Sequence, residues 1–408
     1  MKYTNEAKLI NELITISQVV YQNQQNDKFS ESFGFDEENI SFLGLINISK
    51  YKLSIEKLYT SNKSICETFS FFKFQDRIIE LIRTLKVEKT QCKAENLNEI
   101  IDDIIRIEII EHEIFYPFYG AQMNSDLLKF GDFTIYDKQK CKELLNEKSF
   151  TTNDKDLYFE LIKSDLLISI KIKARESDKA FEIADKYCMS FENVFSYVLG
   201  DLSNDKRIGI FNFRGFSTMG KIISSNSGIG FNGKSDVILG LNLDHNYLSY
   251  FNNKELGNDE VWFLITKKDK SEIEKRLLNA IEWVGKAIND KDNSKSLIQF
   301  VFAIEGMLQY DEKIFINQSI VSQLADSLAF IITDEKEERK KMSRKFKDIY
   351  KKRSSIAHGS NAKIDFEDLE EVFEITKNMI ISFLIKSPFK EMKTMESLNT
   401  HIINLKFN

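Results

Sequence analysis

Two residues that could handle a phosphate group stand close together in the last quarter of the chain. Arg353 and His358 belong to the segment RSSIAHG, which ends with Gly359. A guanidinium binds an anion through two parallel hydrogen bonds, and an imidazole exchanges protons close to neutral pH. Because an Arg and a His at this spacing are common by chance, the elements around them decide whether they form a site.

The residues before this pair are predicted to form a strongly basic helix. Residues 336–353 contain ten Lys or Arg and three acids, a local charge of +7 in a chain of net charge −6. Apolar residues at helical spacing predict its buried face: Met342, Phe346, Ile349 and Tyr350. Arg353 follows Ile349 by four positions and continues this inward face. The alternative is an ordinary solvated helix face along the whole run.

An arginine that points inward needs a partner. Glu305, in the apolar helical segment FVFAIEGML, is the expected counter-charge, because a buried carboxylate is costly unless it is paired. The alternative for Glu305 is a carboxylate at an exposed helix end. On a continuing helix, His358 would point about 140° away from Arg353. Gly359 is a typical helix stop, so the last turn can unwind and bring the imidazole and the guanidinium to one pocket.

A second motif, GIGFNGKS at residues 228–235, matches the pattern GxxxxGK[ST] of a phosphate-binding loop. Such a loop needs a buried strand that leads directly into the first Gly and a helix that starts at the Lys. The sequence predicts neither element. We interpret the segment as a Gly and Asn turn between two strands.

A third cluster consists of Glu111, His112 and Glu113, with Arg106 shortly before it. These residue types could bind a metal ion or move protons. The surrounding isoleucines indicate core, and no fourth ligand-like residue stands at helical spacing. We therefore predict a surface helix end before the turn at Pro117.

The spacing of apolar residues along the chain predicts an α+β protein. Residues 5–114 are predicted to be mainly helical, whereas 115–136, 168–172 and 207–266 have strand and turn patterns, including RIGIFNF and VWFLIT. A helix is expected to start at Ser177 as its N-cap. After Lys267, helices are predicted near 271–290, 294–310, 317–333, 336–356 and 365–386. We therefore expect an N-terminal α+β region at 1–266, with a split near 115–150, and a C-terminal up-and-down helical bundle at 267–408.

The composition of the chain excludes several classes of protein. The chain has 408 residues, which is enough for roughly two or three domains, and its slight negative charge gives no global basic field for nucleic acid. The longest nearly apolar run has seven residues, so we expect no transmembrane helix and place the protein in the cytoplasm. Its four cysteines lack the paired spacing of a zinc site or a disulfide framework.

The helical blocks of the C-terminal region resemble the HEPN superfamily, and most closely its Apea-like branch. AIEWVGKAI, FVFAIEGML, DIYKKRSSIAHG and the closing amphipathic helix follow one another in the order and spacing of that family, over residues 275–386. Many catalytic members have Asn, Asp or His directly after the Arg. This sequence has Ser354 there, whose hydroxyl is a weaker orienting group.

The resemblance implies a metal-independent endoribonuclease that acts as a homodimer through the C-terminal bundle. Such proteins are often toxins or antiviral effectors of abortive infection. Arg353 and His358 would be catalytic, supported by Glu305, Ser354 and Tyr350. The lysines expected to bind the RNA backbone are Lys347, Lys351 and Lys352. No cofactor is expected, and the N-terminal region would meet a phage-derived or cellular trigger, or select the target.

Two other functions stay open at this point. One is a non-catalytic HEPN bundle that is kept for dimerisation or for binding RNA or nucleotides. The other is a nucleotide hydrolase that uses Lys234 of the GIGFNGKS segment.

Overall fold

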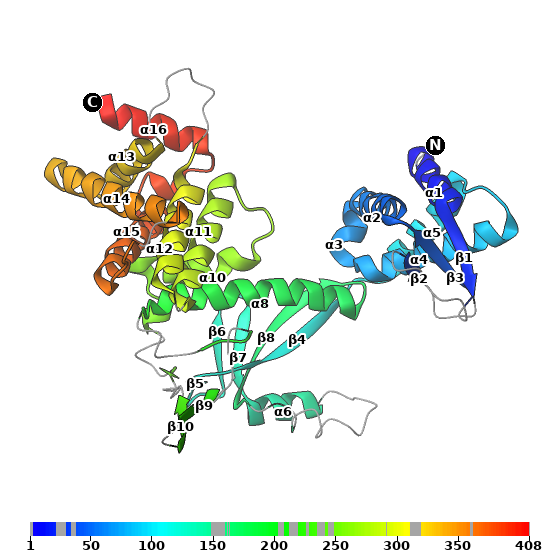
Figure 1. Ribbon diagram of the computed structural model, residues 1–408, viewed down its shortest axis with the longest axis horizontal. Helices are drawn as coiled ribbons and strands as arrows, with labels where there is room; N and C mark the ends of the chain where they lie inside the picture. The colour runs from blue at the N-terminus through cyan, green and yellow to red at the C-terminus, as the bar shows by residue number, and fades with distance from the viewer. Residues whose placement is uncertain are drawn as a thin grey trace. The chain divides into compact units, whose positions relative to one another are not determined.

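The computed structural model divides the chain into two compact units (Figure 1). It describes residues 3–21, 30–33, 38–147, 160, 162, 164–202, 208–211, 219–225, 228–234, 241–243, 249–290, 292–310, 320–359 and 362–407. Unit 1 contains residues 1–114 and 171–185, and unit 2 contains residues 115–170 and 186–408. The chain passes between the units within three elements: β4 (Ile110–Phe118), β8 (Leu166–Ala174) and α8 (Ser177–Leu199).

Unit 1 combines helices with a small antiparallel sheet of order β1-β3-β2. Its strands are β1 (Ser17–Tyr21), β2 (Ser30–Phe33) and β3 (Glu38–Leu43), and its helices are α1 (Thr4–Ile16), α2 (Leu45–Thr60), α3 (Lys63–Thr68), α4 (Phe71–Glu88) and α5 (Ala94–Arg106). The prediction of a mainly helical segment missed this sheet. Val20 keeps the helical spacing of the apolar residues before it, but the backbone turns extended at Ser17 and Val20 pairs with Asn39.

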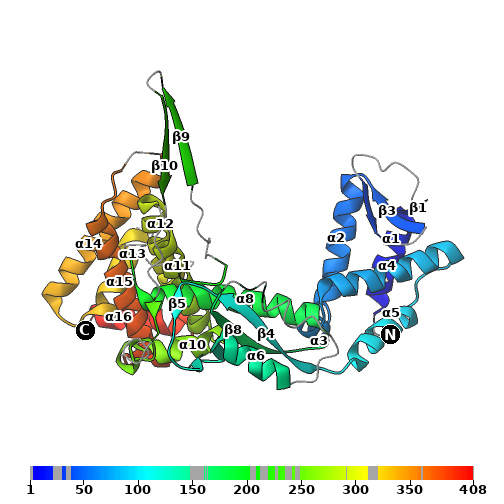
Figure 2. The same ribbon diagram turned by 90° about the horizontal axis from the view of Figure 1, so that it is seen from below.

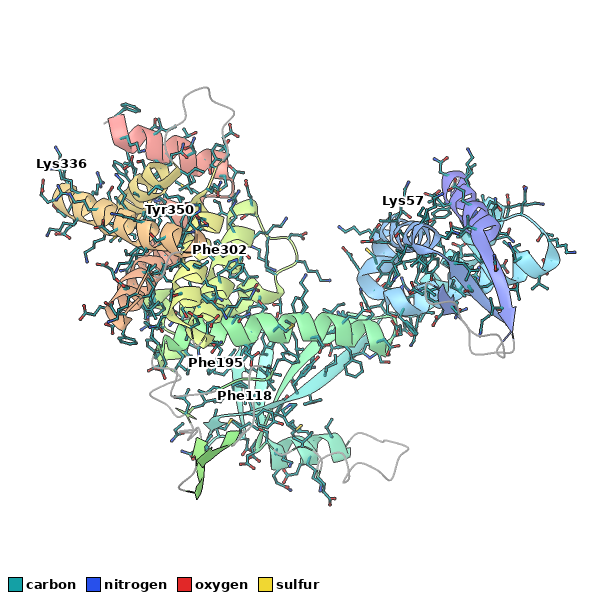
Figure 3. The ribbon with its side chains drawn as sticks, viewed as in Figure 1. Lys57, Phe118, Phe195, Phe302, Lys336 and Tyr350 are labelled. Atoms are coloured by element: carbon teal, nitrogen blue, oxygen red, sulfur yellow. The ribbon has the colours of Figure 1, made fainter. Side chains whose placement is uncertain are left out.

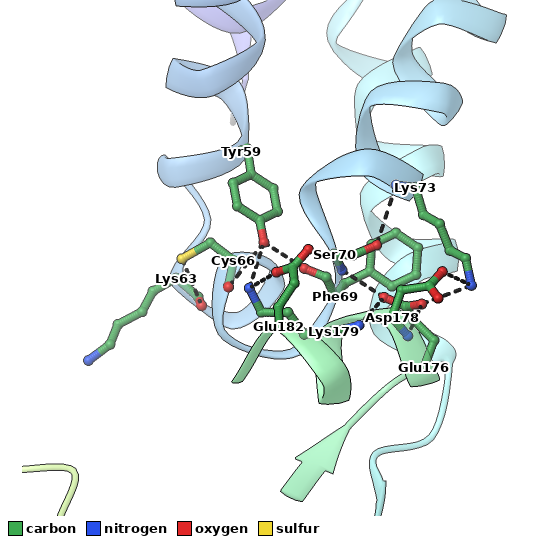
Figure 4. A network of polar contacts seen from close by, with 10 residues as sticks. All are labelled: Tyr59, Lys63, Cys66, Phe69, Ser70, Lys73, Glu176, Asp178, Lys179 and Glu182. Atoms are coloured by element: carbon green, nitrogen blue, oxygen red, sulfur yellow. Dashed lines mark hydrogen bonds and ion pairs between the residues drawn. The ribbon is translucent and has the colours of Figure 1, made fainter. Parts of the chain in front are cut away.

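A network of polar contacts ties the start of α8 to α4 within unit 1 (Figure 4). Glu176 accepts hydrogen bonds from the backbone N–H groups of Ser70 at 2.8 Å and of Lys179 at 3.2 Å, and it forms an ion pair with Lys73 at 2.8 Å. Ser177 is therefore the first helical residue, and the carboxylate before it caps the helix in place of the predicted serine. Burial opposes the charge of Glu176, but these donors outweigh burial and lower its pKa.

The sheet of unit 2 has four strands in the order β4-β8-β7-β6, with β6 at Leu127–Phe130 and β7 at Phe133–Asp137. Strand β7 pairs antiparallel with both of its neighbours. The predicted alternation in β8 is confirmed in its second half, where Lys171 and Lys173 are exposed between buried residues. A cluster of aromatic rings joins this sheet to α8 and α10 (Asn258–Thr266): Phe118, Phe130, Phe133, Phe191, Phe195, Phe251 and Trp262. Figure 2 shows strands β4 and β8 beside α8, and Figure 3 labels Phe118 and Phe195 of the cluster.

Several shorter elements complete the sheet part of unit 2. They are β5 (Ala121–Gln122), α6 (Lys138–Glu147), β9 (Met219–Ser225), β10 (Gly228–Lys234), β11 (Leu241–Asn242), the 3-10 turn η1 (Lys254–Leu256) and α10 (Asn258–Thr266). The strand predicted at VWFLIT is wrong, because these residues lie in α10. Its apolar residues are buried on more than one side, and a short run of that kind does not distinguish a strand from a buried helix. In RIGIFNF, the described residues 208–211 form an isolated bridge between Gly209 and Tyr119, not a strand.

The C-terminal helices follow the prediction closely and confirm the α+β class. They are α11 (Glu272–Asn289), α12 (Asn293–Leu308), α13 (Ile320–Ile332), α14 (Lys336–Ala357) and α15 (Phe366–Ile385). Asp365 and Asp368 form the predicted capping box of α15. A 3-10 turn, η2 (Phe389–Glu391), and a sixth helix, α16 (Met395–Phe407), were not predicted. The buried residues of α16, Met395, Leu398 and Ile402, follow helical spacing, but the exposed Ile403 and Phe407 add apolar residues outside this face and weaken the pattern.

The predicted domain border at 266/267 is wrong, because it falls inside unit 2. Helix α8, before this border, packs directly on α11, after it. A Cβ atom at Gly285 would lie 2.0 Å from the backbone carbonyl oxygen of Asn193, so only glycine permits this approach. Asn289 also donates a hydrogen bond to Ser196 at 2.9 Å. The border between the units at 114/115 lies at the start of the predicted split. Among the described residues, no helix is long and apolar enough to cross a membrane.

Glu274 is expected to make the free energy of unfolding depend on pH in the acidic range. Burial alone would raise its pKa, but hydrogen bonds from Lys267 and from the Ser271 backbone N–H, together with the charge of Lys393, lower the pKa to about 2. A carboxylate with a lowered pKa stabilises the fold above its unfolded pKa of about 4.5. The stabilisation is lost as the pH falls from there towards 2.

We therefore predict that Glu274→Gln lowers the free energy of unfolding by about 2 kcal/mol at pH 7. Denaturant titrations of both proteins should show this difference shrinking as the pH falls from 5 to 2.5. Glu396→Gln, at an exposed position on α16, serves as the control and should change little. A difference that stays constant over this pH range would contradict the assignment.

Candidate active site at the end of helix α14

Helix α14 carries the predicted Arg and His at its C-terminal end. Phe346 and Ile349 are buried as predicted, while Met342 and Tyr350 are half-buried. The helix ends at Ala357, and Gly359 takes the left-handed conformation, with φ of +79°. The predicted stop at Gly359 is therefore confirmed.

The expected unwinding of the last turn is wrong. Ala357 is still helical, and the backbone N–H of His358 donates to the carbonyl oxygen of Ser354 at 3.1 Å, which is the regular α-helical bond. Arg353 and His358 therefore leave the helix on different sides, about 140° apart. The His358 side chain is exposed and has no hydrogen bond or ion pair with any residue that the structure describes.

Arg353 pairs with Glu305 of α12, and Tyr350 binds the same carboxylate. Figure 3 labels Tyr350 on α14 and Phe302 on α12. The Nη2 atom of Arg353 lies 3.3 Å from Oε2 of Glu305, and Oε1 of Glu305 accepts a hydrogen bond from the Tyr350 hydroxyl at 2.8 Å. The predicted pairing of Arg353 with Glu305 is confirmed. The two side chains are 23% and 15% exposed, so the cluster lies at the surface of the helical region, partly open to solvent.

Among the described residues, only Glu305 accepts a hydrogen bond from the guanidinium of Arg353. The guanidinium lies with its carbon atom 5.5 Å from the ring centre of Phe302 and 5.4 Å from that of Tyr350. Its Nε atom is buried without a hydrogen-bond partner in the described part of the chain. One carboxylate oxygen at 3.3 Å satisfies little of a group with five N–H donors. The group is thus fixed in place and able to bind an additional anion.

Tyr350 is kept neutral by its surroundings. Burial raises the pKa of its hydroxyl, and the hydrogen bond to the negatively charged Glu305 raises it further. The neutral hydroxyl donates to Glu305 and so orients the carboxylate that faces Arg353. Tyr350 therefore acts on Arg353 through Glu305.

The lysines of α14 differ in how far their charge is neutralised. Lys352 forms an ion pair with Asp368 on α15, and Lys345 pairs with Glu371 at 2.8 Å. Lys347 and Lys351 are exposed, and neither has an ion pair among the residues that the structure describes. Of the three lysines predicted to bind RNA, Lys347 and Lys351 thus carry free charge. Ser354 is half-buried, and its carbonyl oxygen accepts the His358 N–H.

The cluster of Glu111, His112 and Glu113 lies on strand β4, not at a helix end. Helix α5 already ends at Arg106, and Glu111 forms an ion pair with Lys171 at 3.1 Å. The prediction of a helix end at this cluster is wrong, because the isoleucines between 104 and 110 continue an apolar pattern from α5 into β4. The described residues contain no group of three or more His, Cys, Asp or Glu side chains that could hold a metal ion.

Residues 228–234 of the GIGFNGKS segment lie in a strand, so the interpretation of this segment as a turn is wrong. Residues Gly228–Lys234 make up β10, which pairs antiparallel with β9 over its full length. Gly228 pairs with Ser225, so the chain reverses just before the motif. An extended strand cannot curl its N–H groups around a phosphate as a loop and helix N-terminus do. The geometry gives no support to a nucleotide hydrolase at Lys234.

Two aromatic residues beside Arg353 were missed by the sequence reasoning. Phe302 on α12 touches Arg353, and the ring centre of Trp283 on α11 lies 5.5 Å from that of Phe302. Phe302 precedes Glu305 by three positions and so shares its helix face. This spacing could have identified Phe302.

Comparisons of the chain with protein-family models, with curated proteins and with solved structures find no match.

Proposed function

We propose that the protein is a metal-independent endoribonuclease of the HEPN type, with Arg353 and His358 as its catalytic residues. The observation that carries this proposal is the arrangement at the end of α14. An arginine held by Glu305 and by two aromatic rings stands five residues before an exposed histidine, on a helix whose residues 336–353 carry a charge of +7. The order of the surrounding helices agrees with the resemblance of the sequence to that superfamily.

The proposed reaction uses a nucleophile that RNA itself provides. The ribose 2′-oxygen attacks the adjacent phosphorus, a bond from O2′ to phosphorus forms, and the bond from phosphorus to O5′ breaks. One imidazole accepts the proton of the 2′-hydroxyl, and a protonated imidazole donates a proton to the leaving 5′-oxygen. Arg353 stabilises the additional negative charge on the phosphoryl oxygens. The products are a 2′,3′-cyclic phosphate and a free 5′-hydroxyl.

A homodimer would supply the groups that one chain lacks. The attacking and leaving oxygens lie on opposite sides of the phosphorus, so a single His358 does not easily serve both. In one chain, Arg353 and His358 also leave α14 on different sides. Two copies related by a twofold axis would bring two arginines and two histidines to one cleft.

The exposed lysines of α14 fit a backbone-binding role in this proposal. Lys347 and Lys351 carry free charge on the same side of α14 as His358, because they precede it by eleven and seven positions. Each phosphate that they neutralise would strengthen RNA binding in a salt-dependent way. Lys352 would contribute once a phosphate competes with Asp368. We further propose that the protein acts in the cytoplasm as a toxin or antiviral effector, with the N-terminal region responding to a phage-derived or cellular trigger.

A second candidate function is a non-catalytic bundle that binds RNA or dimerises. The ion pair of Arg353 with Glu305 favours it, because the same contact would also serve a purely structural role. Cleavage by the purified protein separates the two functions.

The test is to incubate total RNA with the purified full chain in excess EDTA and to identify the ends of the products. We expect cleavage that leaves 2′,3′-cyclic phosphates and 5′-hydroxyls, because the 2′-hydroxyl is the nucleophile. Products with 5′-phosphates, or cleavage that stops in EDTA, would contradict the mechanism. Binding of RNA without cleavage, by protein with and without the proposed trigger, would favour the non-catalytic function.

A further inference from the structure

A row of alternating aromatic and basic side chains extends from Arg353 across two further helices. Tyr350 and Arg353 belong to α14, Phe302 to α12, and Trp283 with Lys286 to α11. Each member contacts the next. The Arg353 guanidinium lies over the rings of Tyr350 and Phe302, Phe302 meets Trp283 edge-on at 5.5 Å, and the Lys286 ammonium lies 4.7 Å from the centre of the Trp283 ring. We call this set the aromatic row.

The aromatic row is open to solvent, unlike the apolar faces that hold these helices together. Trp283, Phe302 and Tyr350 are half-buried and Lys286 is exposed. The neighbours that point inward are fully buried, such as Val284 on α11 and Ile304 on α12. Half-exposed aromatic rings interspersed with cations are the composition of surfaces that bind single-stranded nucleic acid, since bases stack on the rings and phosphates meet the cations.

We propose that Trp283 and Phe302 form a base-stacking subsite for single-stranded RNA beside Arg353. The proposal rests on the proposed function and names its substrate class, an unpaired stretch of RNA next to the cleaved phosphate. A duplex keeps its bases stacked on each other, so it cannot use these rings. The charges fit this ligand, because Glu305, the acid that contacts the aromatic row, is already engaged by Arg353 and Tyr350.

Lys286 does not block the subsite. Its contact with the Trp283 ring involves an exposed lysine, and such a contact is weaker than the stacking of a nucleobase on an aromatic ring. A base can therefore displace the ammonium group from the ring. The released lysine is then able to meet the phosphate that accompanies this base.

The two tryptophans of the chain make the subsite directly observable. Trp262 is fully buried and donates its indole N–H to the carbonyl oxygen of Phe251 at 2.9 Å. Trp283 is half-exposed on the aromatic row. A base that stacks on Trp283 should quench its fluorescence and leave that of Trp262 unchanged.

The experiment titrates the full chain with a short single-stranded 2′-O-methyl oligonucleotide, which cannot be cut by 2′-hydroxyl attack. We expect saturable quenching by the single strand and none by the matching duplex. Fluorescence anisotropy of a labelled oligonucleotide should show that Trp283→Ala binds about 5- to 150-fold more weakly. Trp283→Phe should lose the quenching and keep most of the affinity, because phenylalanine still stacks. Lys275→Ala, on the exposed side of α11, is the control and should bind normally.

Several results would overturn the inference. Wild-type affinity in Trp283→Ala would overturn it and leave the proposed nuclease function in place if that variant still cuts RNA. Binding of the single strand without quenching would do the same. If Trp283→Ala changes the oligomeric state in sedimentation at unchanged affinity, the aromatic row is an interface between two copies of the chain. Quenching in a protein that cuts no RNA would support the subsite and count against the catalytic proposal.

Discussion

Replacing His358 with alanine is expected to lower the rate of RNA cleavage by about 10²–10⁴-fold, the usual contribution of a positioned acid or base. The physical reason is that proton transfer to or from the ribose and leaving oxygens then depends on water. Because the His358 side chain is exposed and has no hydrogen bond or ion pair with the described residues, its removal should not destabilise the fold. Initial rates on a defined RNA oligonucleotide in EDTA measure the effect.

Two controls separate chemistry from folding in this measurement. The melting temperature of His358→Ala should match that of the wild type. His401→Ala makes the same substitution on α16, where the ring packs against Phe389, and should leave cleavage unchanged. If His358→Ala cuts RNA as fast as the wild type, then His358 is not the proton-transfer residue and the proposed mechanism fails.

The sequence predicts a helix or strand well where the spacing of its apolar residues fits only one of the two. Helices α11, α12 and α15 have long apolar stripes, and α11 and α15 have capping boxes at their starts, so the bounds of these helices are predicted within a few residues. Strand β1 and helix α10 are short and their apolar residues fit either period. Their structure is decided by partners far away in the sequence, which a local pattern does not contain.

In the candidate site, too, the sequence predicts what a local pattern contains and not what depends on the packing of distant helices. The pairing of Arg353 with Glu305 was predictable, because each was a charged residue on an otherwise apolar helix face and each needed a partner. The place of Trp283 was not, because it depends on how α11 packs beside α12. The direction of His358 was predicted wrongly. Gly359 does stop α14, but it does so after the helix has completed its regular turn through Ala357.

The geometry of that regular turn gives the second prediction with a large effect. Five residues of α-helix separate Arg353 from His358 by about 7.5 Å along the axis and about 140° around it. A phosphate bound by Arg353 of one chain is therefore poorly placed for His358 of the same chain. If the active cleft lies across a twofold axis, each phosphate meets the arginine of one copy and the histidine of the other.

Two inactive variants should then restore activity when they are combined in one dimer. Homodimers of Arg353→Ala and of His358→Ala are each expected to lose about 10²–10³-fold or more. A heterodimer of the two, isolated through different affinity tags after co-expression, retains one arginine and one histidine on opposite chains. It should cut RNA faster than either homodimer but well below the wild-type rate, because one imidazole must then serve both the attacking and the leaving oxygen. If the two residues must come from the same chain, this heterodimer contains no complete pair and stays inactive, so its rate decides directly between the two arrangements.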